Sequence, residues 1–518
     1  MSRTRARGLV YFAIVLGLAL AMRLPHLQTV PHLTDETGEV LFARAITFEG
    51  ARPFTHTDAY NGPLWPYLLA IAFRTFGSSA ALPRLFALAL GMATVAATFA
   101  LGWVLAPVNR RAEAALIAGA LAATSFTHTL VGSRVAWSNS STPLWTTLGV
   151  LTLLAAVRRR SGPLLVAAGF LGGLALHTHP SVSVFLAALV VWFVSAADRR
   201  AWLRSRWPRL AVAGAVLAYG PVIYFNWHEG LQSIREASAS ANAAQRLTAG
   251  GWIVGIGEAI GQLGRSMAGG FALDGPASGM PWLAASTLFV ALTFGAAARL
   301  AMTGGRQSGR RLPLVVAVTT LVGLPLFNRN WHGFLEARYL AFTLPLLYAS
   351  FGSVVAASTS PAAGRTRRLA VSVALIALPA LRVMAYEDAA LAEQFDNRRL
   401  WHMARSASRE AEAGAMVMVD IDLKHVAWRA GGHPRRAVEY LLALEGIPFA
   451  RAPAAKINHF LDQGDTPLVL FLAGPTAVEL GARYRLAPVD VTPRPGEGAW
   501  GLYVAGPAAE RLGAVALP

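Results

Sequence analysis

The stretch Pro63-Leu-Trp-Pro-Tyr-Leu-Leu-Ala-Ile-Ala-Phe-Arg-Thr-Phe76 decides how the rest of the chain is threaded. It is largely apolar but only 14 residues long, whereas a helix needs about 20 residues to cross roughly 30 Å of hydrocarbon. If it crossed, the arginine clusters at 110–111 and 158–160 would both fall outside, against the positive-inside rule. We therefore predict an amphipathic helix along the outer interface, begun by Pro63 and stopped by Gly77.

The composition describes a chain that is solvated mainly by lipid. Of its 518 residues, 54% are hydrophobic and 14% are charged, whereas a soluble domain carries about 25% charged residues. The net charge of +18 comes from short arginine clusters between apolar runs, which is the pattern of membrane anchoring rather than of nucleic-acid binding. The absence of cysteine excludes thiol nucleophiles, Cys-ligated zinc and disulfides.

The remaining apolar runs predict a polytopic α-helical membrane protein of about eleven spans. The spans are expected at residues 8–24, 82–106, 113–132, 143–157, 163–178, 181–197, 209–225, 281–301, 312–327, 337–357 and 369–386. The first of these could instead be a signal peptide, but the many spans that follow favour an uncleaved helix. With arginines before the first span, the N-terminus is expected in the cytoplasm of a bacterial cell and the chain in its inner membrane.

Two domains are expected from the change of composition after residue 387. Residues 1–387 form the transmembrane domain, with outer interfacial helices in 31–80 and 226–280, the latter near residues 231–246. Residues 388–518 form a periplasmic or extracellular α/β domain, with buried strands at 415–420 and 467–473 and helices near 434–445, 454–463 and 475–484.

The outer stretch 31–63 carries most of the candidate chemistry, because it holds five carboxylates. Thr34 is a plausible N-cap of a helix that ends near Gly50, which places Asp35 in the first turn. There the helix dipole favours the ionised form, and an ionised carboxylate can accept a proton from a sugar or lipid hydroxyl. The alternative is that Asp35 and Glu36 only complement the N-terminus of a helix.

Positive groups on the outer face form a second candidate site. They are Arg84, Arg134, Arg329, His332 and Arg338, with Asn139 nearby. Arginine suits a phosphate because its planar fork gives paired, charge-assisted hydrogen bonds. The alternative is that these side chains reach toward outer head groups of the bilayer. Arg338, beside an aromatic residue at the mouth of a span, is the strongest candidate.

His177 and His179 stand at an outer helix end, two residues apart. Such a pair can share a metal ion, but no neighbouring carboxylate in sequence completes a ligand set. Hydrogen-bonded interfacial histidines are the favoured interpretation, so we predict no metal site.

Several blocks of the sequence together resemble a known family. They are Asp35-Glu36 after the first span, Asn61-Gly-Pro-Leu-Trp-Pro-Tyr67, Leu82-Pro-Arg-Leu-Phe-Ala-Leu-Ala-Leu-Gly91, Ser133-Arg-Val-Ala-Trp-Ser-Asn139 and Glu336-Ala-Arg-Tyr-Leu-Ala-Phe-Thr-Leu-Pro345. In order and spacing the chain resembles, over residues 8–350, the integral-membrane GT-C glycosyltransferases. The branch is that of the protein O-mannosyltransferases and the aminoarabinose lipid A transferase, glycosyltransferase family 39 and its bacterial relatives.

The resemblance implies inverting transfer of a hexosyl or pentosyl group from a polyprenyl-phosphate donor. The acceptor would be a lipid, glycan or protein outside the membrane, and nucleic acid is no partner. It also implies catalysis by Asp35 with support from Glu36, and donor phosphate binding by Arg338, Arg84 and Arg134. We expect the other substrate contacts from Asp58, Tyr60, Asn61, His179, His332 and Tyr339.

Two departures from the family bear on cofactors. Some relatives carry lysine where Asn61 stands, and others carry an acid in the second outer loop, whereas residues 114–197 contain no Asp or Glu. We therefore expect metal-independent catalysis without a cofactor, with a divalent cation as the alternative. A transporter or lipid flippase is the rival function, but such proteins place ionisable groups within their spans, and here the carboxylates lie in loops. A membrane-anchored scaffold is the third class.

Overall fold

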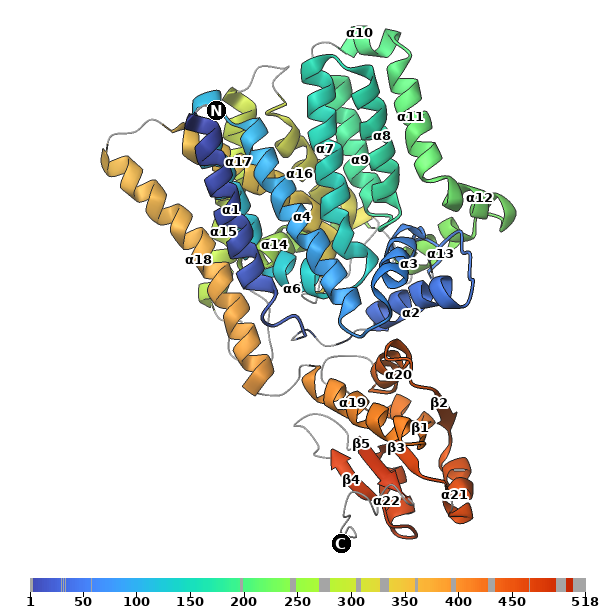
Figure 1. The fold of residues 1–518 in the computed structure, drawn as a ribbon. Coiled ribbons are helices and arrows are strands. Elements are labelled where there is room, and N and C mark those ends of the chain that lie inside the picture. The colour runs from blue at the N-terminus through green and yellow to red at the C-terminus, as the bar shows by residue number, and fades with distance from the viewer. Residues whose placement is uncertain are drawn as a thin grey trace. The chain divides into compact units, whose positions relative to one another are not determined.

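The computed structural model consists mainly of helices, followed by one small sheet (Figure 1). It describes residues 3–28, 30, 32, 34–56, 58–195, 199–242, 248–269, 280–303, 309–326, 335–358, 362–392, 397–426, 434–464, 466–490 and 500–505.

Contacts between residues divide the chain into two compact units. The first, here called the helical unit, comprises Met1–Pro25, Arg52–Leu68 and Arg84–Tyr386. The second, here called the sheet unit, comprises His26–Ala51, Leu69–Pro83 and Glu387–Pro518. Two segments of the first predicted outer region are thus grouped with the C-terminal residues rather than with the spans.

Each predicted span coincides with one helix or with a pair of consecutive helices. They are α1 (Arg3–Arg23), α4 (Leu82–Leu105), α5 (Arg111–Thr124) with α6 (Phe126–Arg134), α7 (Thr142–Arg159), α8 (Gly162–Leu176), α9 (Val182–Ser195), α11 (Trp207–Ala218) with α12 (Gly220–His228), α15 (Met280–Thr303), α16 (Leu312–Gly323), α17 (Leu344–Ala357) and α18 (Ala362–Ala392). The short helix α10 (Arg199–Arg204) precedes α11.

Helix length supports fewer membrane crossings than the hydropathy pattern predicts. Within the described ranges, six helices are long and apolar enough to cross a membrane, or up to eight if each bent pair is one span. The other predicted spans fall on shorter apolar helices, α8, α9 and Leu312–Leu326. The polytopic helical architecture is therefore confirmed, whereas the count of eleven spans is not.

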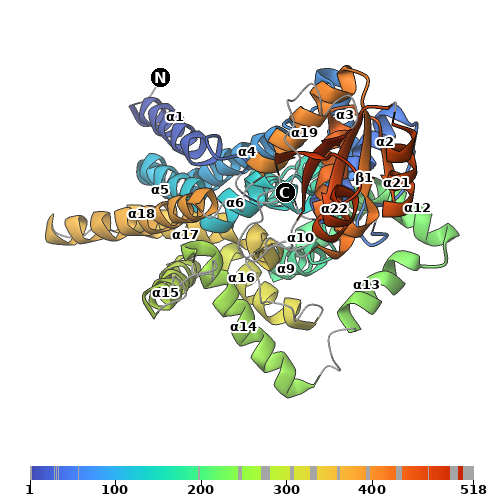
Figure 2. The same cartoon turned by 90° about the horizontal axis from the view of Figure 1, so that it is seen from below.

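The helices expected in the outer regions are also present. Helix α2 covers Thr34–Phe48, and α3 covers Leu64–Phe76, the stretch that was predicted not to cross. In the long region 226–280, α13 (Gln232–Asn242) lies where a helix was predicted, and α14 (Ala249–Ala268) packs against α15 (Figure 2). Their placement at a membrane interface stays a prediction.

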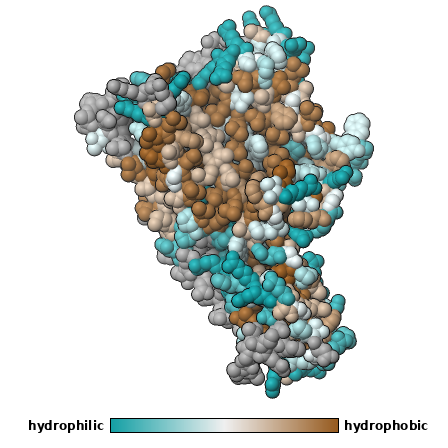
Figure 3. Space-filling view, in the orientation of Figure 1, coloured by the Kyte–Doolittle hydropathy of each residue, from teal (hydrophilic) through white to brown (hydrophobic). Residues whose placement is uncertain are grey.

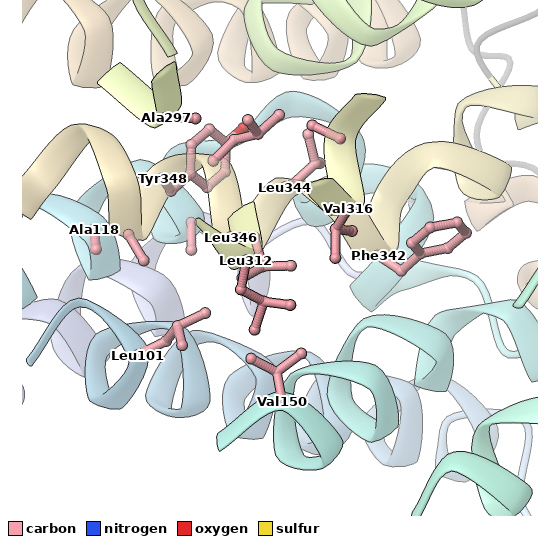
Figure 4. Close-up of a cluster of buried hydrophobic side chains, with 14 of the residues drawn as sticks. Leu101, Ala118, Val150, Ala297, Leu312, Val316, Phe342, Leu344, Leu346 and Tyr348 are labelled. Atoms are coloured by element: carbon pink, nitrogen blue, oxygen red, sulfur yellow. The ribbon is translucent and has the colours of Figure 1, made fainter. Parts of the chain in front are cut away.

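The core of the helical unit is formed mainly by aliphatic and small side chains, with aromatic rings among them. Figure 4 shows side chains from α4, α5, α7, α15, α16 and α17 meeting in one cluster, with Leu312 and Leu346 near its centre. Apolar side chains also cover much of the visible surface of these helices, as Figure 3 shows. A bundle that is apolar both inside and outside is what lipid solvation requires.

Close approach of two helices depends on small residues. Gly169 and Gly173 lie one turn apart on α8, where added Cβ atoms would come within 2.1 Å of the Ala211 carbonyl oxygen and 2.4 Å of the Ala215 carbonyl oxygen of α11. Small residues spaced by four positions let helix backbones touch in this way. Larger side chains here would force α8 and α11 apart.

A buried arginine closes the break between α5 and α6. The two helices meet at Ser125 with a bend of 64°, so carbonyls at the end of α5 lose their helical partners. The guanidinium of Arg23, at the end of α1, donates to the carbonyl oxygens of Ala122 (3.0 Å) and Ala123 (2.5 Å) and to Ser133 Oγ (3.1 Å). Arg23 is fully buried, and its Nη2 also donates to His128 Nδ1 at 2.8 Å.

A second buried arginine, Arg134, caps the C-terminal end of α1. Arg134, the last residue of α6, donates from Nε to the Arg23 carbonyl oxygen (3.2 Å) and from Nη2 to the Met22 carbonyl oxygen (2.6 Å). These carbonyls lie in the last turn of α1, where no following turn of helix supplies N–H donors. The two arginines therefore join α1, α5 and α6 by capping one another's helix ends.

Among its described residues, the sheet unit contains five strands in the order β2-β1-β3-β5-β4. They are β1 (Met416–Asp420), β2 (Phe449–Ala452), β3 (Leu468–Ala473), β4 (Ala487–Asp490) and β5 (Trp500–Ala505). β1 pairs in parallel with β2 and β3, while β5 is antiparallel to β3 and β4. The predicted strands at 415–420 and 467–473 are confirmed as β1 and β3.

Helices connect the parallel strands in two directions. Helix α20 (Pro434–Leu444) leads from β1 to β2, and α21 (Ala454–Gln463) leads from β2 past β1 to β3. Because such crossovers are right-handed, they place α20 and α21 on opposite faces of the sheet. Helix α19 (Arg398–Glu412) packs on α20 and α22 (Gly474–Gly481) on α21, which confirms the predicted α/β pattern.

The Arg23 contacts predict a large loss of stability on replacement. In Arg23→Leu, the free energy of unfolding should fall by about 3 kcal/mol or more, because two buried carbonyls lose charged donors. Arg23→Lys should recover only part of this loss, since an ammonium lacks the planar fork. The measurement is thermal unfolding of the detergent-solubilised protein, with the exposed Arg7→Gln as control. An unchanged midpoint in Arg23→Leu would contradict the capping role.

Candidate active site

Four segments of the helical unit bring aromatic and charged side chains together around Arg338. Arg338 and Tyr339 lie in the 3-10 helix η5 (Leu335–Thr343), and His179 lies in the turn between α8 and α9. Trp137 precedes the 3-10 helix η2 (Ser138–Ser141). We use the name Arg338 cluster for Asp58, Tyr60, Trp137, His179, Arg338 and Tyr339.

Aromatic faces hold the guanidinium of Arg338. Its central carbon lies 4.3 Å from the ring centre of Trp137 and 4.8 Å from that of Tyr339, and Nη2 donates to the Tyr339 hydroxyl at 2.8 Å. Trp137 is itself fixed, because it is buried and donates from Nε1 to the Val131 carbonyl oxygen at 3.3 Å. These three contacts are to neutral groups, so they orient the guanidinium while preserving its charge.

His179 joins the cluster as a neutral imidazole. Its ring centre lies 4.5 Å from Tyr339 and 6.2 Å from Tyr60. The backbone N–H of Ser181 donates to His179 Nδ1 at 3.1 Å, so the ring proton resides on Nε2. Loss of solvent around the ring and the positive charge of Arg338 lower the pKa of His179 to about 3.

The turn that carries Tyr60 is fastened to α13. The Tyr60 hydroxyl lies 3.3 Å from Asp58 Oδ2. Between them, the Ala59 backbone N–H donates to Glu236 Oε2 at 2.9 Å, and Ser233 Oγ donates to the Ala59 carbonyl oxygen at 2.5 Å. Two hydrogen bonds to one residue set the position of this turn on the long outer segment.

Asn61 and Gly62 connect the same turn to the histidine turn. Asn61 is buried, and its backbone N–H donates to the Asp58 carbonyl oxygen at 2.9 Å. Gly62 donates from its backbone N–H to the His177 carbonyl oxygen at 2.9 Å. The His177 ring lies against Gly62 and is itself held, because its Nε2 lies 2.8 Å from the Ala218 carbonyl oxygen.

Asp35 and Glu36 lie in the sheet unit and differ in exposure. Both belong to the first turn of α2, as predicted. Asp35 is exposed to solvent, whereas Glu36 is completely buried with its Oε2 3.4 Å from Nδ1 of the equally buried His32. An exposed carboxylate can meet a substrate, while a buried, paired one is suited to holding structure.

The remaining predicted site residues are distributed elsewhere. Arg134 caps α1, which accounts for a buried arginine at this position without a ligand. Arg84 lies in the first turn of α4 and is fully buried. His332, like Arg329, falls outside the described residues.

Three contributors were not anticipated from sequence. Trp137 lies in the block 133–139 that carried the family resemblance. The only sequence signal for its role was an aromatic residue followed by two polar residues. Glu236 and Ser233 act through backbone atoms of Ala59, which no side-chain pattern in either segment reveals.

The chain is similar to known proteins in part of its sequence and in its fold. Residues 60–225 match the sequence profile described as dolichyl-phosphate-mannose-protein mannosyltransferase. No curated protein matches the chain in sequence. Among solved structures, ArnT from Cupriavidus metallidurans bound to undecaprenyl phosphate is similar at a TM-score of 0.60 and 13% identity, covering 96% of this chain and 99% of that one. Its apo form gives 0.59, with 13% identity and coverages of 98% and 100%.

Over residues 60–225 the chain is therefore similar to the protein mannosyltransferases, and its fold is similar to that of ArnT. AglB from Archaeoglobus fulgidus, an archaeal oligosaccharyltransferase in complex with an inhibitory peptide and a dolichol-phosphate, is also similar in fold. Its TM-score is 0.50 at 13% identity, covering 95% of this chain and 74% of that one. The profile match and the fold of ArnT agree with the resemblance first seen in the sequence, and they do not favour the transporter alternative.

The close contact of Gly62 with His177 predicts that any side chain at position 62 destabilises the fold. A Cβ at this position would lie 1.9 Å from His177 Nδ1, and the buried ring has no room to withdraw. Gly62→Ala should lower the free energy of unfolding by about 1–3 kcal/mol through overpacking. In thermal unfolding, adding His177→Ala should reverse part of the loss. Gly38→Ala, where a Cβ meets nothing within 4 Å, is the control.

The electrostatics of the cluster predict an imidazole that stays neutral at mild acidity. Nuclear magnetic resonance of ¹⁵N-labelled histidine should show His179 uncharged with its proton on Nε2 from about pH 8 to 5, the signal being assigned with His179→Gln. Arg338→Gln should raise the pKa of His179, because it removes a nearby positive charge. Because the pKa of His179 is lower in the folded protein than in the unfolded chain, its contribution to stability is fully present above the unfolded-state pKa. This contribution is lost as the pH falls toward 3. A His179 signal that titrates normally in the unaltered protein would contradict this account.

Proposed function

We propose that this chain is a GT-C glycosyltransferase that transfers a sugar from a polyprenyl-phosphate donor to an acceptor on the outer face of the membrane, with inversion at the anomeric carbon. The observation that carries the proposal is the Arg338 cluster, a cation held by aromatic faces within this fold. Binding of undecaprenyl phosphate by the structurally similar ArnT supports a lipid phosphate as the ligand.

The proposed step forms one bond and breaks one bond at the anomeric carbon. The acceptor oxygen attacks from the face opposite the phosphate, and the bond between the anomeric carbon and the phosphate oxygen breaks. The electron pair of that bond leaves with the polyprenyl phosphate, and the proton of the acceptor passes to a base. A phosphate leaving group therefore needs positive charge more than it needs a proton donor.

Arg338 is assigned to the donor phosphate. Its guanidinium is planar, permanently charged and already oriented by Trp137 and Tyr339, so little freedom is lost when a phosphate binds. The neutral His179, with its proton on Nε2, can donate a hydrogen bond to the donor without competing for its own proton. Arg84 remains a candidate for the same phosphate, whereas we leave Arg134 out because it caps α1.

Tyr60, Asp58, Asn61 and Tyr339 are assigned to the sugar. The Tyr60 hydroxyl and the Asp58 carboxylate form a paired donor and acceptor, which is the arrangement that hydroxyl groups of a sugar can bind. The transferred group is a hexosyl or pentosyl unit. The acceptor is a lipid, a glycan or a protein.

Asp35 is assigned as the base that accepts the proton of the acceptor. It is exposed in the first turn of α2, where its carboxylate can accept a proton from a hydroxyl of the acceptor. The proposal uses no metal ion, because Arg338 supplies the charge that the leaving phosphate requires. The N-terminus lies in the cytoplasm and the C-terminal residues outside the bacterial inner membrane.

Replacement of Asp35 tests the function directly. Transfer from a labelled polyprenyl-phosphate sugar should fall by about 10²- to 10⁴-fold in kcat for Asp35→Asn, the usual contribution of a general base. Glu49→Gln, an exposed acid near the other end of α2, is the matched control and should transfer normally. Full activity of Asp35→Asn would remove this mechanism, and absence of transfer from every polyprenyl-phosphate sugar would remove the function.

A further inference from the structure

Helix α2 is packed against the C-terminal α/β fold. It belongs to the sheet unit, and its main helical neighbour there is α20, which leads from β1 to β2. The contacts of α2 and of the segment before it with this fold involve three polar residues that are completely or almost completely buried: His32, Glu36 and Asn397. Burial of polar groups costs free energy unless each group has a hydrogen-bond or ionic partner, so the partners of these residues hold the cluster together.

Asn397 fastens the segment that leads into α2. Its backbone N–H donates to the Gln28 carbonyl oxygen at 3.2 Å. Its side-chain Nδ2 donates to the Val30 carbonyl oxygen at 2.8 Å, and its Oδ1 accepts from the His32 backbone N–H at 3.0 Å. One residue thus binds three alternate positions of the chain, as a neighbouring strand would.

The first turn of α2 is fixed by a second set of contacts. His32 Nδ1 lies 3.4 Å from Glu36 Oε2, one turn further along, and both side chains are fully buried. The His32 ring lies 4.7 Å, centre to centre, from the buried ring of Tyr440 in the middle of α20. Glu36 is the immediate neighbour of Asp35, so these contacts fix the turn that carries Asp35.

The far end of α20 binds the second outer segment of the sheet unit. Ser78 Oγ donates to the Leu444 carbonyl oxygen at 2.8 Å, and the Ala80 backbone N–H donates to Glu445 Oε1 at 3.0 Å. Thr47 Oγ1 of α2 also lies 3.3 Å from the Ala70 carbonyl oxygen. Residues 26–51 and 69–83 are therefore attached to α20 along its length as well as to one another.

We propose that His32, Glu36, Asn397 and Tyr440, here called the α2 joint, are positioning residues through which the C-terminal fold sets the Asp35 carboxylate. This proposal rests on the proposed function for its catalytic consequence. It changes the predicted role of Glu36, which acts through the placement of its neighbour and not as a second catalytic carboxylate. It also gives the C-terminal α/β fold a task in the transfer reaction itself.

A distance measurement tests the joint without any assay of transfer. The chain has no cysteine, so Gly38→Cys with Val478→Cys creates the only two sites for nitroxide labels. A Cβ at Gly38 meets nothing within 4 Å, and Val478 on α22 is 75% exposed, so both labels are tolerated. Double electron–electron resonance should give a narrow distribution of label distances, which broadens when Asn397→Ala is added.

Kinetics separate positioning from simple destabilisation. In an otherwise unaltered protein, Asn397→Ala should lower kcat about 10- to 100-fold, because small misplacements of a catalytic group cost this much. The KM for the lipid donor should stay within about twofold. Tyr440→Phe keeps the ring beside His32 and should retain more activity than Tyr440→Ala.

A matched control removes a different hydrogen bond of the same unit. Asn458 accepts from the Tyr484 hydroxyl near α21, away from the α2 joint, so Asn458→Ala should change neither the label distances nor kcat. An unchanged distance distribution in Asn397→Ala would overturn the joint. Broadened distances with an unchanged kcat would overturn its catalytic role. If the unaltered protein transfers no sugar, the proposed function fails, while the distance measurement still decides whether the joint holds α2.

Discussion

The helical unit depends on one constraint, which is that backbone polar groups away from water must find partners inside the protein. The bend of 64° at Ser125 breaks the hydrogen-bond ladder between α5 and α6 and would leave carbonyls exposed to an apolar surrounding. Arg23 meets them from the end of α1, and Arg134 meets the end of α1 in return. This exchange fixes three helices by few contacts and explains why cations are buried there.

The same unit builds its candidate site from turns held by backbone contacts. Gly62 touches the His177 backbone and ring, Ala59 is bound by Glu236 and Ser233, and His179 accepts from Ser181. Each of these contacts sets a turn and leaves the side chains of Tyr60, His179 and Tyr339 to face one another. The guanidinium of Arg338 is then oriented by the aromatic faces of Trp137 and Tyr339.

The sheet unit is a compact unit built from three segments that are not contiguous in the sequence. Its doubly wound core comes from residues after 387, yet α2 packs against α20 and Ser78 and Ala80 form hydrogen bonds at the end of α20. Asn397 and His32 meet although 365 positions separate them. An outer loop between two spans has little core of its own, so a neighbouring fold that buries its apolar side chains determines its structure.

The sequence by itself determined the helices, the strands β1 and β3, the resemblance to a glycosyltransferase family, and the choice that residues 63–76 form a separate helix. These follow from hydropathy, period and turn residues, which act over short distances along the chain. Tertiary structure alone decided the tasks of chemically equal residues. Arg134 and Arg338 were both predicted to lie on the outer face, yet one caps α1 and the other lies between aromatic rings. The same holds for Asp35 and Glu36, because Glu36 is fully buried beside His32 whereas Asp35 is exposed. Such differences arise from partners that lie far away in sequence, so no local pattern encodes them.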